Sequence, residues 1–252
     1  MKAWIVKWAP PLLVLALLVG GWEALAQFGS VEDYLLPAPS DVARALVNDR
    51  DLLLPDAWVT LREVLFGFAL ALAAGLAAAT LLHLSPVARR ALYPLVVGSQ
   101  AIPVIVIAPI LVIWFGFGMT PKLIVIALIC FFPITVNTLD GLASVDPAQV
   151  KMLRTLDASR WQVFRRLELP SALPYVFSGA RVAVAVAVIG AVFGELVGSD
   201  QGLGHVIQVG TAQLLTARVF AATLLLALMG IALFALVGFV QRRAVPWAGR
   251  ER

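Results

Sequence analysis

The sequence predicts an all-α membrane protein with about six transmembrane helices, on the basis of composition, charge and the length of its apolar runs. Of the 252 residues, 61% are hydrophobic and 13% are charged, and the mean hydropathy is +0.94. A soluble domain has about 45–50% apolar and about 25% charged residues. The apolar residues also fall into runs of roughly 20, the length that crosses the hydrocarbon core of a bilayer. Lipid is therefore the expected solvent.

Six segments satisfy this length and account for residues 1–252 as a single membrane domain. They run over residues 8–28, 58–82, 92–115, 121–139, 174–197 and 217–240. The fourth segment is the shortest and contains Pro133. The single cysteine, Cys130, lies in an apolar run and has no partner for an intramolecular disulfide.

The first segment has an alternative interpretation as a cleaved signal peptide. Lys2 and Lys7 precede an apolar run that contains the small residues Ala24 and Ala26, as before a cleavage site. Glu23 and two prolines interrupt that run, however, and the segment is long enough to cross a bilayer. We expect a retained span, and the remaining topology is the same in either case.

The basic residues predict the orientation, because cytoplasmic loops are enriched in Lys and Arg. If six spans alternate, one side receives Lys2, Lys7, Arg89, Arg90, Lys151, Arg154, Arg160, Arg165, Arg166, Arg242, Arg243, Arg250 and Arg252. The first long loop on the other side carries mainly acidic residues, which are Glu32, Asp33, Asp41, Asp49, Asp51 and Asp56. Both termini of this multi-pass membrane protein are therefore expected to be cytoplasmic.

Small residues recur every fourth position in the second and fifth segments. In the fifth segment they are Gly190, Gly194 and Gly198. Such rows let helix backbones approach closely, which favours helix association in lipid. Packing within one chain and a seam between two copies remain equal alternatives for these glycines.

The connection over residues 146–173 is expected to contain two short helices at the cytoplasmic surface. Asp146 before a proline is typical of a helix start. Ser159, with Gln three residues later, has the pattern of a capping box. Pro170 is expected to stop the second helix, since proline lacks an N–H and restricts the residue before it. The two helices would meet at residues 157–158.

The second short helix is amphipathic. Trp161, Phe164 and Leu167 recur at three-residue spacing between arginines. Such a helix could lie on the lipid surface, or it could place its apolar edge in a groove of a partner protein. The pattern taken alone favours the lipid surface.

This same connection resembles the EAA loop of binding-protein-dependent ABC transporter permeases. The resemblance rests on residues 154–159, Arg-Thr-Leu-Asp-Ala-Ser, and on residues 169–174, Leu-Pro-Ser-Ala-Leu-Pro. It implies a bundle like that of a type I importer permease, with a coupling helix that sits in a cleft of a cytoplasmic ATPase. The coupling residues implied in this sequence are Arg154, Leu156, Asp157, Ala158, Ser159, Trp161 and Phe164.

Other motifs narrow the resemblance to one branch of this family. Residues 36–40 (Leu-Pro-Ala-Pro-Ser), residues 114–118 (Trp-Phe-Gly-Phe-Gly) and residues 202–204 (Gly-Leu-Gly) look like the nitrate, sulfonate and bicarbonate branch. Residues 131–134 and 187–192 look most like permeases for thiamine pyrimidine precursors or riboflavin. A permease for sulfonate, taurine or nitrate is the alternative.

Two departures from the family pattern affect the loop. Lys151, Met152 and Leu153 replace the acidic residue and alanines that open it, and Asp157 replaces a glycine. A glycine between two helices usually takes a left-handed conformation. Asp tolerates this region better than most residues, at a cost of about 1 kcal/mol, so the turn is expected to survive.

Phe131, Phe132, Asn137 and Glu195 are the candidate pathway residues. The first three lie near Pro133, and irregular backbone at membrane depth can line a water-filled path, although proline kinks also occur in purely structural helices. Glu195, near the outer end of its span, could line the path or a gate, because ionisable residues in membranes usually face a cavity or a partner. The alternative is an interfacial residue that reaches water.

The expected function is the membrane-spanning permease subunit of an ATP-driven importer, and not an enzyme. The sequence contains no G-x-x-x-x-G-K-[ST] phosphate loop. The resemblance implies that ATP and Mg are bound by a partner ATPase dimer, with no cofactor or metal on this chain. It also implies an extracytoplasmic solute-binding protein and a homodimer, with no nucleic acid. The alternatives of another class are an ion-gradient-driven secondary transporter and a membrane-embedded enzyme.

Overall fold

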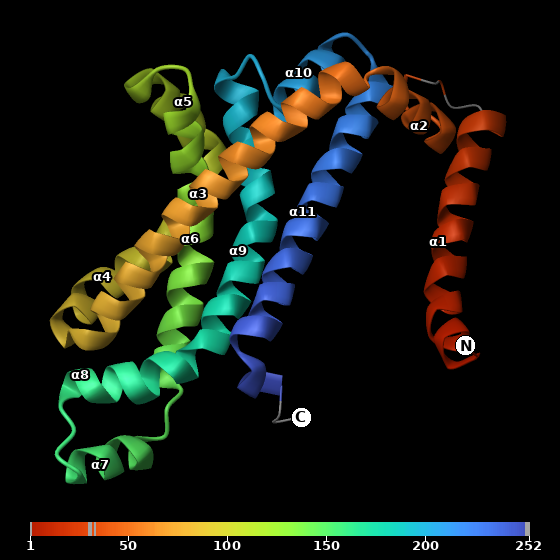
Figure 1. The fold of residues 1–252 in the computed structure, drawn as a ribbon. Coiled ribbons are helices and arrows are strands. Elements are labelled where there is room, and N and C mark those ends of the chain that lie inside the picture. Colours follow the sequence, from red (N-terminus) through yellow and green to blue (C-terminus); the bar gives the residue numbers. More distant parts are fainter. Residues whose placement is uncertain (1, 30–31, 33, 250–252) are drawn as a thin grey trace.

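A computed structural model describes residues 2–29, 32 and 34–249, and these residues form an all-helical bundle. The elements are α1 (Lys2–Phe28), α2 (Pro39–Asn48), α3 (Arg50–Leu84), α4 (Pro86–Gly98), the 3₁₀ turn η1 (Ser99–Ala101), α5 (Val104–Phe115), α6 (Met119–Ala143), α7 (Pro147–Thr155), α8 (Arg160–Val163), the π-helical turn η2 (Phe164–Glu168), α9 (Leu169–Gly198), α10 (Leu203–Ala212), α11 (Thr216–Ala244) and the 3₁₀ turn η3 (Pro246–Gly249). Figure 1 shows this arrangement.

Among the described residues, four helical runs are long and apolar enough to cross a membrane. They are α3, α6, the run Arg160–Gly198 that ends in α9, and α11. The bent pair α4 and α5 adds a fifth candidate, and Leu13–Phe28 of α1 is a shorter apolar helix. The all-α membrane fold expected from composition is confirmed.

The third predicted segment, residues 92–115, is not one continuous helix. The helical stretches Pro86–Ala101 and Val104–Phe115 meet at a bend of 100°. Pro103 explains the break, because it has no N–H to donate and disfavours the helical conformation in the residue before it. Ile102 accordingly has an extended backbone, with φ −85° and ψ 117°.

Pro170 does not end the second short helix, contrary to the prediction. The chain remains helical from Arg160 to Gly198. Leu169 donates its N–H to the carbonyl of Phe164, five residues back, so the hydrogen-bond register shifts by one residue in η2. The missing N–H of Pro170 then falls at the start of the new register in α9, where proline is tolerated.

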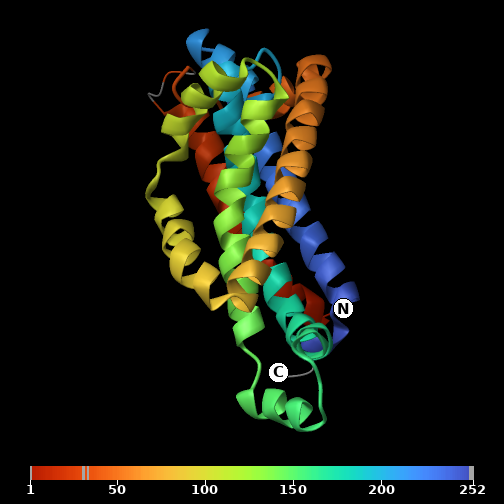
Figure 2. The same ribbon diagram turned by 90° about the vertical axis from the view of Figure 1, so that its left-hand side faces the viewer.

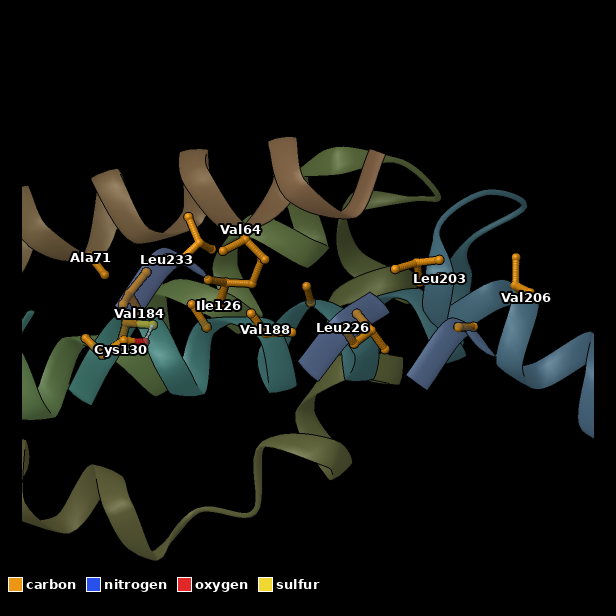
Figure 3. Close-up of a cluster of buried hydrophobic side chains, with 14 of the residues drawn as sticks. Val64, Ala71, Ile126, Cys130, Val184, Val188, Leu203, Val206, Leu226 and Leu233 are labelled. Atoms are coloured by element: carbon orange, nitrogen blue, oxygen red, sulfur yellow. Dashed lines mark hydrogen bonds between the residues drawn. The ribbon is translucent and has the colours of Figure 1, made fainter. Parts of the chain in front are cut away.

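The core is formed by α3, α6, α9 and α11, and α6 packs most extensively against α9 and α3. Figure 3 shows Val64 from α3 pointing toward Ile126 of α6 and Val188 of α9, with Leu226 of α11 close by. These side chains are almost completely buried. The aliphatic cluster therefore joins segments far apart in the sequence.

Close approach of α6 and α9 depends on residues without side chains. A Cβ atom added at Gly179 would lie 2.7 Å from the carbonyl oxygen of Pro133. In lipid the hydrophobic effect does not drive helices together, so close packing of their backbones at small residues such as Gly179 contributes much of their association. The α6–α9 contact is therefore sensitive to even a single methyl group.

The two ends of the bundle differ. Figures 1 and 2 place α7 and α8 at one end, with the described N-terminal and C-terminal helix ends, and α2 and α10 at the other. Helix α1 stands beside the bundle in Figure 1 and is tied to it by Glu23, which accepts hydrogen bonds from the Ser40 N–H at 3.0 Å and hydroxyl at 2.8 Å. Asp33, Arg250 and Arg252, used above to predict orientation, lie outside the described residues.

Gly179→Ala is expected to destabilise the bundle by about 1–3 kcal/mol, because the new methyl group would overlap backbone in α6. The measurement is thermal unfolding of the purified protein in detergent. Gly230→Ala in α11 is the matched control, since its Cβ would meet its nearest atom at 3.8 Å, an ordinary contact. Equal unfolding midpoints for the two variants would contradict the proposed packing.

Candidate functional site

The segment α7–α8 protrudes from one end of the bundle, and its helix starts are capped as the sequence predicts. The Asp146 carboxylate accepts the Ala148 N–H at 2.8 Å. Ser159 and Gln162 form a reciprocal capping box: the Ser159 hydroxyl accepts the Gln162 N–H at 3.3 Å, and the Gln162 side chain accepts the Ser159 N–H at 2.7 Å. These contacts fix where α7 and α8 begin.

Asp157 occupies the left-handed region between the two helices. Its φ is 62°, and the Ala158 N–H closes the turn on the carbonyl of Leu153 at 3.1 Å. This is the conformation that glycine provides elsewhere in the family pattern. The turn is thus retained despite the substitution.

The exposed surface of this segment includes large apolar side chains among its polar ones. Leu156 is 72% exposed and Trp161 is 60% exposed, and Met152 is exposed beside them. Other predicted coupling residues also lie at the surface, namely Arg154, Asp157 and Ser159, whereas Ala158 is half-buried. Large apolar side chains exposed together at the end of a membrane bundle are typical of a protein-binding surface.

Phe164 differs from the other predicted coupling residues because it is buried, with 4% of its surface exposed. It packs with Leu142 and Ala172, and its ring stacks on Trp161 with centroids 5.4 Å apart. It can position the Trp161 ring but does not itself present a surface to a partner.

Two side-chain contacts tie this segment to the end of α3. The His83 Nε2 and Glu168 Oε2 atoms are 2.8 Å apart. The Arg160 guanidinium donates to the Leu84 carbonyl at 2.5 Å. A displacement of α8 therefore acts directly on both α3 and α9.

The predicted pathway residues Phe131 and Phe132 are half-buried. They pack beside Tyr93 and Val96 of α4, against the buried side chain of Leu82 in α3. The two phenylalanines thus contribute to the contact between α6 and the first half of the broken helix.

Asn137 and Glu195 are not brought together. The Asn137 amide donates to the Pro133 carbonyl in its own helix at 2.7 Å, and it faces Gly179. Glu195 lies about 24 Å farther along α9 at about 1.5 Å per residue. The predicted pathway set therefore divides into two separate places.

Glu195 is completely buried at the other end of the bundle, so the interfacial alternative is wrong. One carboxylate oxygen accepts the Thr60 hydroxyl at 2.6 Å, and the other accepts the Gly204 N–H at 2.5 Å. The Leu203 N–H donates to the Thr60 oxygen at 2.9 Å. Glu195 and Thr60 together satisfy the first two N–H groups of α10, those of Leu203 and Gly204.

A buried ion pair beside Glu195 was missed by sequence reasoning. The Lys122 ammonium of α6 donates to Glu63 of α3 at 2.6 Å and to the Ser199 hydroxyl at 2.6 Å. Lys122 and Glu63 are 6% and 4% exposed. The available signal was the acid Glu63 in the predicted segment 58–82 and the base Lys122 in the segment 121–139, because ionisable residues in membranes usually pair.

The glycine row of α9 faces other helices of the same chain. Added Cβ atoms at Gly190 and Gly194 would lie 3.2 Å from the α carbons of Ile126 and Lys122 in α6. At Gly198 the added atom would lie 2.8 Å from Val112 of α5. All three positions therefore support packing within one chain.

A membrane bundle with an exposed, capped helix pair at one end defines a class of transport permeases. Residues 71–246 match the family described as the binding-protein-dependent transport system inner membrane component. The chain belongs to this family and is an ABC importer permease subunit. This assignment decides against the ion-gradient-driven transporter and the membrane-embedded enzyme, and the family implies an ATPase and a binding protein as partners.

Relatives with similar sequences extend over nearly the whole chain. The formylaminopyrimidine transport permease protein ThiX of Halalkalibacterium halodurans is 37% identical, covering 96% of each chain. The riboflavin transport system permease protein RibX of Chloroflexus aurantiacus is 38% identical, covering 93% of this chain and 88% of its own. The taurine transport system permease protein TauC of Escherichia coli is 30% identical, covering 97% and 94%.

The fold is also similar to a solved transporter. A chain of the MetNI methionine ABC transporter, in inward-facing conformations, superposes with a TM-score of 0.66 and 20% identity. The match covers 81% of this chain and 99% of that chain. The predicted type I importer permease fold is confirmed.

Lys122→Met is expected to destabilise the protein by about 3–5 kcal/mol, because it leaves the Glu63 carboxylate buried without its cation. Glu63→Gln combined with Lys122→Met is expected to recover most of this loss. Thermal unfolding in detergent measures both. If the double variant is no more stable than Lys122→Met, the charge pairing is not the source of the effect.

Asp157→Val is expected to destabilise the α7–α8 turn by about 1–2 kcal/mol, since a β-branched residue is unfavourable at φ 62°, whereas Asp157→Gly relieves strain. Hydrogen exchange of the amides around Ala158 measures the turn. Thr155→Val, in the last turn of α7, is the control. Faster exchange in Asp157→Gly than in the native protein would argue against a left-handed requirement.

Proposed function

We propose that the exposed α7–α8 segment is the docking site of a cytoplasmic ATPase dimer, and that the bundle forms the solute path of an importer. The observation that carries this proposal is the pre-formed, capped helix pair with exposed Leu156 and Trp161. An ordered apolar edge binds a partner groove with a small loss of conformational entropy. Ala158 and Ser159 lie at its centre and are the positions where a docked surface comes closest.

The α7–α8 segment is connected so that movement of the ATPase can reach the bundle. Glu168 links it to His83 of α3, and η2 joins it without interruption to α9. ATP-driven closure of the ATPase pair would shift α8 and change the relative stability of inward-facing and outward-facing states. ATP and Mg are held by the ATPase, and this chain supplies no residue to hydrolysis.

The α7–α8 end is assigned to the cytoplasm, together with both termini, in a bacterial inner membrane. The basic residues Arg89, Arg165 and Arg242 belong to this end, in agreement with the enrichment of basic residues in cytoplasmic loops. The opposite end would receive solute from an extracytoplasmic binding protein. Two copies of this chain would enclose the path, which is the usual symmetry of a homo-oligomer.

The proposed solute is a small planar heterocycle, such as a thiamine pyrimidine precursor or riboflavin. The relatives named for formylaminopyrimidine and riboflavin, at 37% and 38% identity, support it over the taurine relative at 30%. A sulfonate, taurine or nitrate remains the alternative.

Ala158→Glu is expected to reduce ATPase recovery and ATP-driven uptake at least tenfold, because it places a charge at the centre of an apolar docking edge. The measurements are affinity purification of the tagged chain from native membranes with mass spectrometry, and uptake of labelled formylaminopyrimidine by cells.

Ala212→Glu, exposed at the opposite end of the bundle, is the matched control and should retain both ATPase and uptake. A second variant, Ser159→Arg, repeats the test at the neighbouring position. Full recovery of a phosphate-loop ATPase with Ala158→Glu and Ser159→Arg would show that the ATPase binds elsewhere. Purification of the chain without any ATPase would contradict the proposal as a whole.

A further inference from the structure

A cavity of about 410 Å³ opens at the α10 end of the bundle, opposite the α7–α8 segment. Its volume lies within the range of about 300–1,000 Å³ typical of small-molecule sites. The α5–α6 turn, α6, the end of α9 and α10 all contribute to its wall. The side chains used in the argument below are Phe117, Lys122, Ser199, Asp200, His205 and Gln208.

Lys122 brings an unused hydrogen-bond donor to this cavity. Its ammonium group has three N–H donors, of which one is directed to Glu63 and one to Ser199. Within the described part of the chain, the third donor makes no hydrogen bond. Because Lys122 lines the cavity and is only 6% exposed, a polar atom placed in the cavity can accept this third donor.

His205 supplies a second polar atom without a partner. Its Nδ1 atom is enclosed by protein, and its other ring nitrogen, Nε2, makes no hydrogen bond to any described residue and is the atom that can meet a solute in the cavity. Gln208 lies one helical turn farther along α10 and presents an exposed amide to the same cavity. The cavity wall thus has a hydrogen-bond donor on α6, Lys122, and two side chains on α10, His205 and Gln208, that can donate or accept hydrogen bonds.

The electrostatics of the cavity disfavour an anion. The positive charge of Lys122 is compensated by Glu63, and Asp200 adds an exposed carboxylate at the wall. A helix N-terminus could attract an anion, but that of α10 is already occupied: the Gly202 N–H donates to Asp56 at 2.7 Å and the Gly204 N–H donates to Glu195. No uncompensated positive group is left in the described wall.

Phe117 provides an apolar face beside these polar groups. It lies in the α5–α6 turn, and 81% of its surface is exposed. An exposed aromatic ring can stack on a planar ring at offset geometry. The wall therefore combines one aromatic face with hydrogen-bonding groups at its edge.

We infer that this cavity is a solute site at the outer mouth of the permease, and that it selects an uncharged planar heterocycle over a sulfonate or nitrate anion. Lys122 donates to an acceptor on the ring, His205 and Gln208 bond its edge, and Phe117 covers a face. This inference rests on the proposed function, and these residues distinguish the two solute classes considered there, the planar heterocycle and the anion.

The test is equilibrium binding of labelled formylaminopyrimidine, and separately of labelled taurine, to the purified permease–ATPase complex without the binding protein. Formylaminopyrimidine is expected to bind more tightly than taurine. His205→Ala and Gln208→Ala should each weaken its binding about threefold to tenfold, the effect of one lost hydrogen bond. His205→Gln, which keeps a polar atom near the position of Nε2, should restore most of the affinity.

Gln213→Ala, near the end of the same helix and outside the cavity wall, is the matched control and should bind like the native complex. Asp200→Lys should raise the affinity for taurine, because it adds an uncompensated positive charge. The inference is overturned if taurine binds the native complex more tightly, if neither solute binds, or if His205→Ala and Gln208→Ala leave binding unchanged.

ATP-driven uptake by proteoliposomes that contain the complete transporter separates this inference from the proposed function. If formylaminopyrimidine is taken up but its binding is unchanged by His205→Ala and Gln208→Ala, the cavity is not its binding site and the importer function still holds. Uptake of taurine alone would reject the heterocycle as the solute, and with it the selectivity assigned to the cavity.

Discussion

The buried polar cluster near the α10 end is the constraint on which the rest of the bundle depends. A bilayer offers polar groups no water, so each one must find a partner inside the protein. Glu63 and Lys122 pair across α3 and α6, and Glu195 with Thr60 joins α3, α9 and α10. These partners fix the relative rotation of the helices, because a small rotation of any one would separate a charge from its partner.

The opposite end of the bundle is held differently. There, α7 and α8 are exposed, and their links to the bundle include the His83–Glu168 contact, the Arg160 hydrogen bond, the packing of Phe164 and the continuous helix through η2. A bundle that is rigid at one end and held by a few specific contacts at the other can transmit a displacement of α8 along its helices. Movement of α8 would be passed along α9 and α3 as whole helices, since neither has an internal break between the two ends.

Local signals predicted the α7–α8 segment well, because capping residues and a left-handed turn are determined by a few neighbouring side chains. Asp146, Ser159 and Asp157 adopt the expected roles. The continuation of the helix through Pro170 was not predictable, since a π turn can absorb a missing N–H and has no clear sequence signature. The Glu63–Lys122 pair was missed for another reason: which charges meet depends on helix rotation, and that is determined by packing.

The same cluster that stabilises the bundle also determines the electrostatic character of its α10 end. The N–H groups at the start of α10 already donate to Glu195, Thr60 and Asp56. The positive charge of Lys122 is compensated by Glu63. A site built for an anion would leave such groups free, because charge-assisted bonds from them supply most of its affinity. On the proposal made for the cavity, structural satisfaction of the buried charges and discrimination against anionic solutes would be two consequences of one arrangement.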